Sequence, residues 1–136
     1  MAAKSPAGPI NADRGEFALT LDGERFGLRP SYSALNEAEE ATGMGLIVLA
    51  REALAGSLTR DQLARVACIF MREWGRLVDN TGAAGANADK VGRMIMDSHG
   101  GMAEAMTTIG TLLSLAVTGG LTPEGEVKPA TIPTTA

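Results

Sequence analysis

The clearest pattern of hydrophobic and polar positions lies between Leu58 and Val78. Apolar residues recur there every three or four positions, the spacing that lines one side of an α-helix. Thr59 followed by Gln62 predicts a capping box, in which the two side chains bind backbone groups that the first helical turn leaves unpaired. We therefore predict a long amphipathic helix at the centre of the fold. Its apolar stripe comprises Leu63, Val66, Ala67, Phe70, Trp74, Leu77 and Val78.

Two short apolar runs precede this helix, on either side of Asp22-Gly23. That dipeptide favours a two-residue β-hairpin turn, because both residues tolerate positive φ. The turn fixes the register, and one face of the hairpin is then apolar. A two-stranded hairpin is marginal alone, so this face must pack on helices, and a free edge can pair with a second copy to form a homo-oligomer. The predicted opposite pairs are Leu19 with Phe26, Phe17 with Leu28, and Glu16 with Arg29.

Capping residues and apolar spacing predict four more helices. The first begins at Ser31 or Ser33 and ends near Thr42, before Gly43. The second, from Met44 to Ala55, is apolar almost all round, which predicts burial on several sides. Glycine-rich residues 80–88 predict a mobile loop. The last two helices, residues 87–99 and 102–118, have the form of a helical hairpin.

The predicted fold is α+β: an N-terminal β-hairpin followed by a compact bundle of about five α-helices, with disordered termini. We expect a flexible lead over residues 1–14, a single domain over residues 15–120 and a disordered tail over residues 121–136. The predicted core comprises Phe17, Leu19, Phe26, Leu28, Leu35, Leu46, Leu49, Leu63, Val66, Phe70, Trp74, Ile109 and Leu113.

The composition of the chain narrows the classes of function that it can have. The chain of 136 residues has a formal net charge of −4 and a pI near 5.0, which disfavours nucleic acid as a partner. The N-terminus lacks the apolar run of a signal peptide, and no apolar stretch approaches the roughly 20 residues that span a bilayer. Because Cys68 is the only cysteine, an intrachain disulfide is excluded. A cytoplasmic protein without membrane partners is expected.

Catalytic chemistry is not indicated. Asp97, Ser98 and His99 are the residue types of a hydrolytic triad, but consecutive helical positions point in different directions and cannot hydrogen-bond in series. Cys68 lies beside the apolar stripe, where a cysteine usually behaves as a small hydrophobe. The glycines do not form a phosphate-binding loop. We therefore expect no enzyme activity, no cofactor and no metal site.

Two groups of residues are candidates for partner binding. Met94, Met96, Met102 and Met106 place flexible thioethers in the last two helices, where they serve as core filler or as an adaptable groove for an apolar helix. Arg65, Arg72 and Arg76 fall together on the polar side of the central helix at about 100° per residue. They form either a solvated face or a docking site for carboxylates.

The run from Gly15 to Gly56, GEFALTLDGERFGLRPSYSALNEAEEATGMGLIVLAREALAG, resembles the gene transfer agent family of phage-like tail assembly proteins. With the long helix and the two closing helices, the resemblance covers about residues 14–120. The features that carry it are, in order, the hairpin at Asp22-Gly23, the strand ending at Leu28, Ala34-Leu35 and Glu39 leading to Gly43, the apolar segment, Leu58 and the long helix.

The resemblance implies a tail assembly chaperone of a bacterial, phage-like system. Such a protein is non-enzymatic and holds the tape-measure protein soluble while tube subunits polymerise around it. The resemblance also fits a structural tail or tail-tube component, whose hairpin edge would join neighbouring subunits. A helical nucleic-acid-binding regulator is the alternative from another class, and the acidic balance of the chain argues against it.

Overall fold

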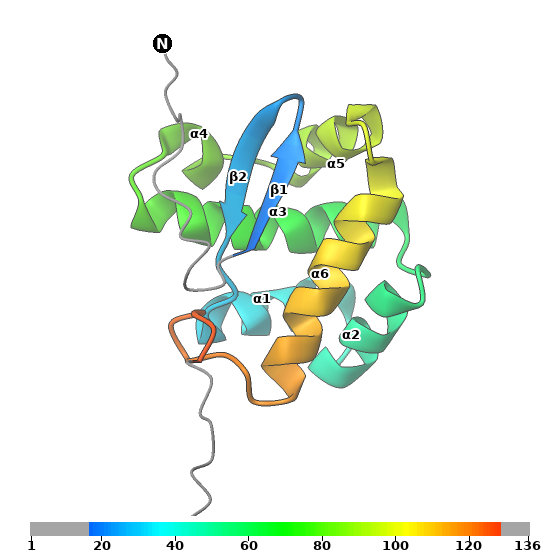
Figure 1. Cartoon of the computed structure of the whole chain (residues 1–136), viewed down its shortest axis with the longest axis vertical. Helices are drawn as coiled ribbons and strands as arrows, with labels where there is room; N and C mark the ends of the chain where they lie inside the picture. Colours follow the sequence, from blue (N-terminus) through cyan, green and yellow to red (C-terminus); the bar gives the residue numbers. More distant parts are fainter. Residues whose placement is uncertain (1–16, 129–136) are drawn as a thin grey trace, which may run out of the picture.

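The computed structural model describes residues 17–128 and has the predicted α+β fold. An antiparallel hairpin crosses the long helix α3, and the other helices surround this pair (Figure 1). The elements are β1 (Phe17–Leu21), β2 (Glu24–Leu28), α1 (Tyr32–Thr42), α2 (Leu46–Leu54), α3 (Arg60–Leu77), α4 (Thr81–Ala84), α5 (Ala88–Asp97) and α6 (Gly101–Val117).

The hairpin has the predicted turn and register. Asp22 and Gly23 both have positive φ, as a two-residue turn of this type requires. Leu19 pairs with Phe26, and Phe17 pairs with Leu28, so the apolar face has the predicted composition. Its residues are buried except for Phe17, which is partly buried. The predicted pair of Glu16 with Arg29 lies partly outside the described residues.

Helix α3 is the centre of the fold, as its pattern predicts. Thr59 Oγ1 accepts a hydrogen bond from Gln62 N at 3.0 Å, and Gln62 Oε1 accepts one from Thr59 N at 2.9 Å, which completes the capping box. The helix contacts β2, α1, α4, α5 and α6. Because it has neighbours on several sides, burial extends beyond the predicted stripe to Ala64, Cys68, Ile69, Met71 and Gly75. Leu77, predicted to belong to the stripe, is instead exposed, because it lies at the last residue of the helix.

The buried residues form one hydrophobic cluster that includes most of the predicted core. Trp74 is only 3% exposed, which confirms the assignment of the central helix. Three predicted core residues are partly buried and pack against the cluster: Phe17, Leu35 and Leu46. The fully buried members of the predicted core with the lowest exposure are Leu49, Leu63, Val66, Phe70, Ile109 and Leu113.

Helix α1 begins and ends where its capping residues predict, whereas α2, predicted from Met44 to Ala55, spans Leu46–Leu54 and has no side-chain cap of its own at its start. Ser31 Oγ accepts a hydrogen bond from Ala34 N, and Gly43 is left-handed at the end of α1. The Glu39 carboxylate accepts a hydrogen bond from Leu46 N at 2.8 Å, so a side chain of α1 binds the first turn of α2.

Residues 80–88, predicted to be a mobile loop, contain the short helix α4. Asn80 caps it, and Ala83 is fully buried against α3. A Cβ atom at Gly75 would lie 2.4 Å from Ala84 N, so the absence of a side chain there lets α4 approach closely. The prediction failed because this contact lies between α3 and α4 and leaves no periodic pattern in so short a segment.

Helices α5 and α6 form at the predicted positions, but their arrangement is not an antiparallel hairpin. Their axes turn by 117° at the break between them. The main neighbour of α6 is α2, and the main neighbour of α5 is α3 (Figure 1). The close approach of α2 and α6 depends on Gly110, where a Cβ atom would lie 2.9 Å from Leu54 Cδ2.

The predicted disordered tail begins with an ordered segment, residues 121–128, which folds back on the start of α1. Leu121 and Val127 form an isolated β-bridge. Tyr32 N donates to Pro123 O at 2.8 Å, and Arg29 Nε donates to Glu124 O at 2.7 Å. These partners are about 95 positions apart in the chain, so local composition could not reveal them. The predicted lead over residues 1–14 lies outside the described residues, as do residues 129–136.

Candidate interaction surfaces

The three predicted arginines lie on the exposed side of α3, where two of them are already paired. Arg65 Nε contacts the Asp61 carboxylate at 2.7 Å, and Arg76 contacts Glu73 at 2.6 Å. These pairs neutralise much of the positive charge of the predicted ridge. A row of arginines balanced in this way is a poor match for the phosphate backbone of a nucleic acid.

A cleft with a volume of about 430 Å³ lies beside Arg65 and Arg72. One wall belongs to α1 and carries Glu37 and Glu40, and the other belongs to α3. Apolar residues of both helices also line it, so the cleft combines charges of both signs with apolar surface. The remaining lining residues are Ala41, Cys68, Ile69, Ala86, Asn87 and Ala88.

Cys68 and Arg72 lie next to each other at this cleft. Burial raises the pKa of the Cys68 thiol, and the neighbouring Arg72 charge and hydrogen bond offset only part of that effect. The thiol is 3% exposed and donates to Ala86 O at 3.4 Å. A buried, protonated thiol is a weak nucleophile. Arg72 Nε is also buried, without a hydrogen-bond partner among the described residues.

A second groove, of about 500 Å³, separates the N-terminal half of α3 from α5. Its apolar lining includes Met96 and Ala64, and Arg60 donates to Met96 Sδ at 3.8 Å. The two helices lie close because a Cβ atom at Gly92 would already be 3.1 Å from that of Ala64. This groove shares Arg65 with the cleft, so the two hollows adjoin along one face of α3.

The four predicted methionines do not form one surface. Met106 is 6% exposed and belongs to the hydrophobic cluster, so it is core filler and cannot reach a partner in this structure. Met94 and Met102 are partly buried and pack against the same cluster. Only Met96 has a largely exposed side chain. Of the predicted partner-binding residues, the structure therefore places Met96, Arg65 and Arg72 on adjoining hollows.

An exposed apolar face on α2 was missed by the sequence analysis, which expected this helix to be buried on several sides. Leu49, Ala50 and Ala53 are buried, but Ile47 is 62% exposed and Leu54 is 58% exposed. Val48 is exposed as well. Arg51 and Glu52 were the available signal, because charged residues in an otherwise apolar helix usually mark its solvent side. We call Ile47, Val48 and Leu54 the α2 face.

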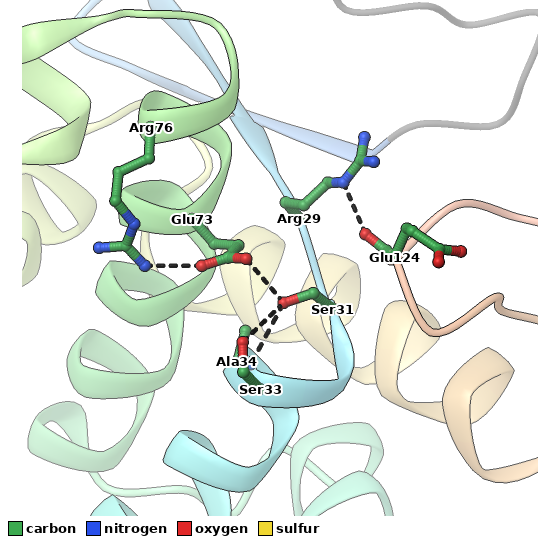
Figure 2. A network of polar contacts seen from close by, with 7 residues as sticks. All are labelled: Arg29, Ser31, Ser33, Ala34, Glu73, Arg76 and Glu124. Carbon is green, nitrogen blue, oxygen red and sulfur yellow. Dashed lines mark hydrogen bonds and ion pairs between the residues drawn. The ribbon is translucent and has the colours of Figure 1, made fainter.

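Polar side chains connect β2, α1 and α3 at the junction between strand and helix (Figure 2). The Glu73 carboxylate accepts hydrogen bonds from Ser31 Oγ at 2.9 Å and from Arg76 at 2.6 Å. Burial alone would raise the pKa of Glu73, but these hydrogen bonds and the charges of Arg76 and Arg29 lower it overall. Arg29 points away from this group, toward Glu124 of the C-terminal segment. The network fixes the fold rather than forming a pocket.

The remaining residues considered for catalysis or metal binding do not form a site among the described residues. Ser98 Oγ donates to Ile95 O at 2.8 Å, so this hydroxyl is bound to a backbone carbonyl at the end of α5. Among residues 17–128, no group of His, Cys, Asp and Glu side chains could hold a metal ion.

Within residues 17–128, no single helix is long and apolar enough to cross a membrane. The bent pair α5 and α6 has a suitable combined length and composition, but its apolar residues belong largely to the core.

Clefts and an exposed apolar helix face on a small α+β domain are features of a protein that acts by contacting other macromolecules. The family comparison agrees with this class. The model of the family described as "Phage tail tube protein, GTA-gp10" matches residues 14–119, and the chain belongs to this family of phage-like tail proteins. Comparison with curated proteins and with solved structures gave no match.

Proposed function

We propose that this protein is a structural component of a phage-like tail and contributes to the tail tube. The observation that carries the proposal is the extent of the family match, because residues 14–119 include every helix and strand described. The role of the family therefore applies to the folded domain itself and not to an appended segment. The protein would act by binding other tail proteins or its own copies, without catalysis.

The hairpin offers one way to join subunits. Its sheet has only two strands within the described residues, so each strand has an outer edge without a strand partner. Backbone groups along such an edge can bind a strand from another molecule. A head-to-tail contact of this kind repeats from one subunit to the next, as an extended tube requires.

A second candidate function is a tail assembly chaperone that binds the tape-measure protein. The α2 face favours it, because three large apolar side chains are exposed on one helix. Such a face can cover an apolar stripe on a long helical partner and keep that partner soluble. A structural subunit would instead bury the same face against its neighbours in the finished tail.

Mass spectrometry of purified, intact particles separates these functions. A tube component is expected in many copies per particle, comparable to the other tail proteins. A chaperone is expected in the producing cell and in a complex with the tape-measure protein, but not in the finished particle. Absence from the particles would overturn the structural proposal.

Co-expression with the tape-measure protein tests the second candidate directly. Ile47→Glu should reduce the soluble yield of a bound partner if the α2 face holds it. Leu77→Glu is the matched control, because Leu77 is 57% exposed and lies on another helix. Equal yields of the partner with wild type, Ile47→Glu and Leu77→Glu would exclude the α2 face as its binding site.

A further inference from the structure

The cleft between α1 and α3 has walls of opposite charge that do not neutralise each other. Glu37 and Glu40 are exposed on the α1 wall, and Arg65 and Arg72 lie on the α3 wall. The ion pairs described within residues 17–128 do not join these walls: Arg65 pairs with Asp61 on its own helix, and neither glutamate is in a pair. We call these surfaces the acidic wall and the arginine wall.

Both walls retain capacity for further contacts. A guanidinium has five N–H donors, and the Arg65–Asp61 contact is made through Nε, so other donors of Arg65 remain. Arg72 Nε is buried and has no acceptor among the described residues, so a partner carboxylate would bind the terminal nitrogens of Arg72 and not Nε. Ala41 of the α1 wall and Ile69 of the α3 wall also line the cleft and supply apolar surface that a partner could cover.

The charge arrangement is the one that a two-fold dimer needs. A two-fold axis parallel to the cleft would place the acidic wall of one molecule over the arginine wall of its partner, and the reverse contact would form at the same time. A surface whose two halves carry opposite charge is thus complementary to a second copy of itself. An unrelated partner would have to carry the same bipolar pattern independently.

We propose that this cleft is a self-association surface, in which Glu37 and Glu40 of one copy bind Arg65 and Arg72 of a second copy. The inference goes beyond the proposed function, because it identifies a contact that is separate from the hairpin edge. It is tested with the purified protein alone, so its failure would not bear on the presence of the protein in particles.

Sedimentation equilibrium over a range of protein concentrations provides the test. Wild type is expected to form a dimer that weakens as salt is raised to about 1 M, where charges are screened beyond about 3 Å. The variant Glu37→Lys/Glu40→Lys and the variant Arg65→Glu should each raise the dissociation constant by about tenfold or more, because like charges then face each other. An equimolar mixture of the two variants should recover association, because each supplies the wall that complements the other.

The control variant is Glu24→Lys/Asp97→Lys, which changes the net charge equally at two exposed sites outside the cleft. It should associate like wild type. All substituted side chains are exposed, and circular dichroism checks that each variant is folded. A monomeric wild type at every concentration would overturn the proposal. Association that is unaffected by both cleft variants, or a mixture that stays monomeric, would also overturn it.

Discussion

Gly27 of strand β2 lies directly against the indole ring of Trp74. A Cβ atom at position 27 would lie 2.2 Å from Trp74 Nε1, far inside the contact distance of real atoms. Gly27 belongs to the hairpin face that carries few apolar side chains, yet it is buried. The hairpin therefore contacts helices on both of its faces. Because Gly27 has no side chain, strand β2 can pack directly on α3.

The first prediction follows from this contact. Gly27→Ala should lower the free energy of unfolding by about 1–3 kcal/mol, the usual effect of overpacking. Chemical denaturation followed by the fluorescence of Trp74, the only tryptophan, measures it. Gly82→Ala is the control, since a Cβ there would meet its nearest neighbour at an ordinary 3.5 Å. Equal stability of the two variants would show that the strand and the ring are not in close contact.

The second prediction concerns the capping box of α3. Thr59→Ala should destabilise the protein by about 1 kcal/mol, because Gln62 N loses its acceptor at the start of the central helix. Thr107→Ala is the comparison, because the Thr107 hydroxyl binds a backbone carbonyl within α6, where alanine is well tolerated. Urea denaturation midpoints measure both effects. If Thr59→Ala leaves the midpoint unchanged, the cap does not stabilise the fold.

The third prediction is a pH dependence of stability. The pKa of Glu73 is lower in the folded protein than in the unfolded chain, so its stabilising contribution is present at neutral pH and is lost as the pH falls through the folded-state pKa. Glu73→Gln should therefore be less stable than wild type by up to about 1 kcal/mol at pH 7.

That difference should shrink once the pH falls below the ordinary glutamate pKa of about 4.3. Thermal denaturation at a series of pH values measures it. Glu24→Gln, at an exposed position of the hairpin, should show no such difference. A stability difference for Glu73→Gln that stays constant between pH 7 and the acid limit of folding would contradict the assigned pKa shift.

The fourth prediction concerns the C-terminal segment. A chain that ends at Gly120 should be less stable than wild type by about 1–3 kcal/mol, because the hydrogen bonds of Arg29 and Tyr32 to this segment are lost. A chain that ends at Lys128 keeps these contacts and should be more stable than the chain that ends at Gly120. Denaturation of the two shortened chains side by side measures the effect. Identical midpoints would mean that the docked segment does not stabilise the domain.

Local chemistry predicted the hairpin and most helix ends. The Asp22-Gly23 turn sets the register without help from distant residues, and Thr59, Asn87 and Gly43 act on backbone groups within a few positions. Helix α4 and the docking of residues 121–128 were not predictable in this way. Both depend on backbone contacts with distant segments, such as Gly125, which lies against the backbone of Pro30 and Ser31.

The interaction surfaces were predicted less completely. Helical spacing correctly placed Arg65, Arg72 and Arg76 on one side of α3, but it could not show which of them have a carboxylate nearby. Composition drew attention to the methionines, yet burial of Met106 and exposure of Met96 depend on how α5 and α6 pack. The sequence alone shows that the glutamates of the acidic wall are charged residues of α1. Its position opposite the arginines required the packing of α1 on α3.

The docked segment also sets an order of events during synthesis. Residues 121–128 emerge from the ribosome after all of the helices, and they bind the junction between β2 and α1, which emerges first. The hairpin and the early helices can form while translation continues, but the contacts of Arg29 and Tyr32 with this segment form only after residues 121–128 have been made. The junction is therefore completed only after all of the helices have been translated.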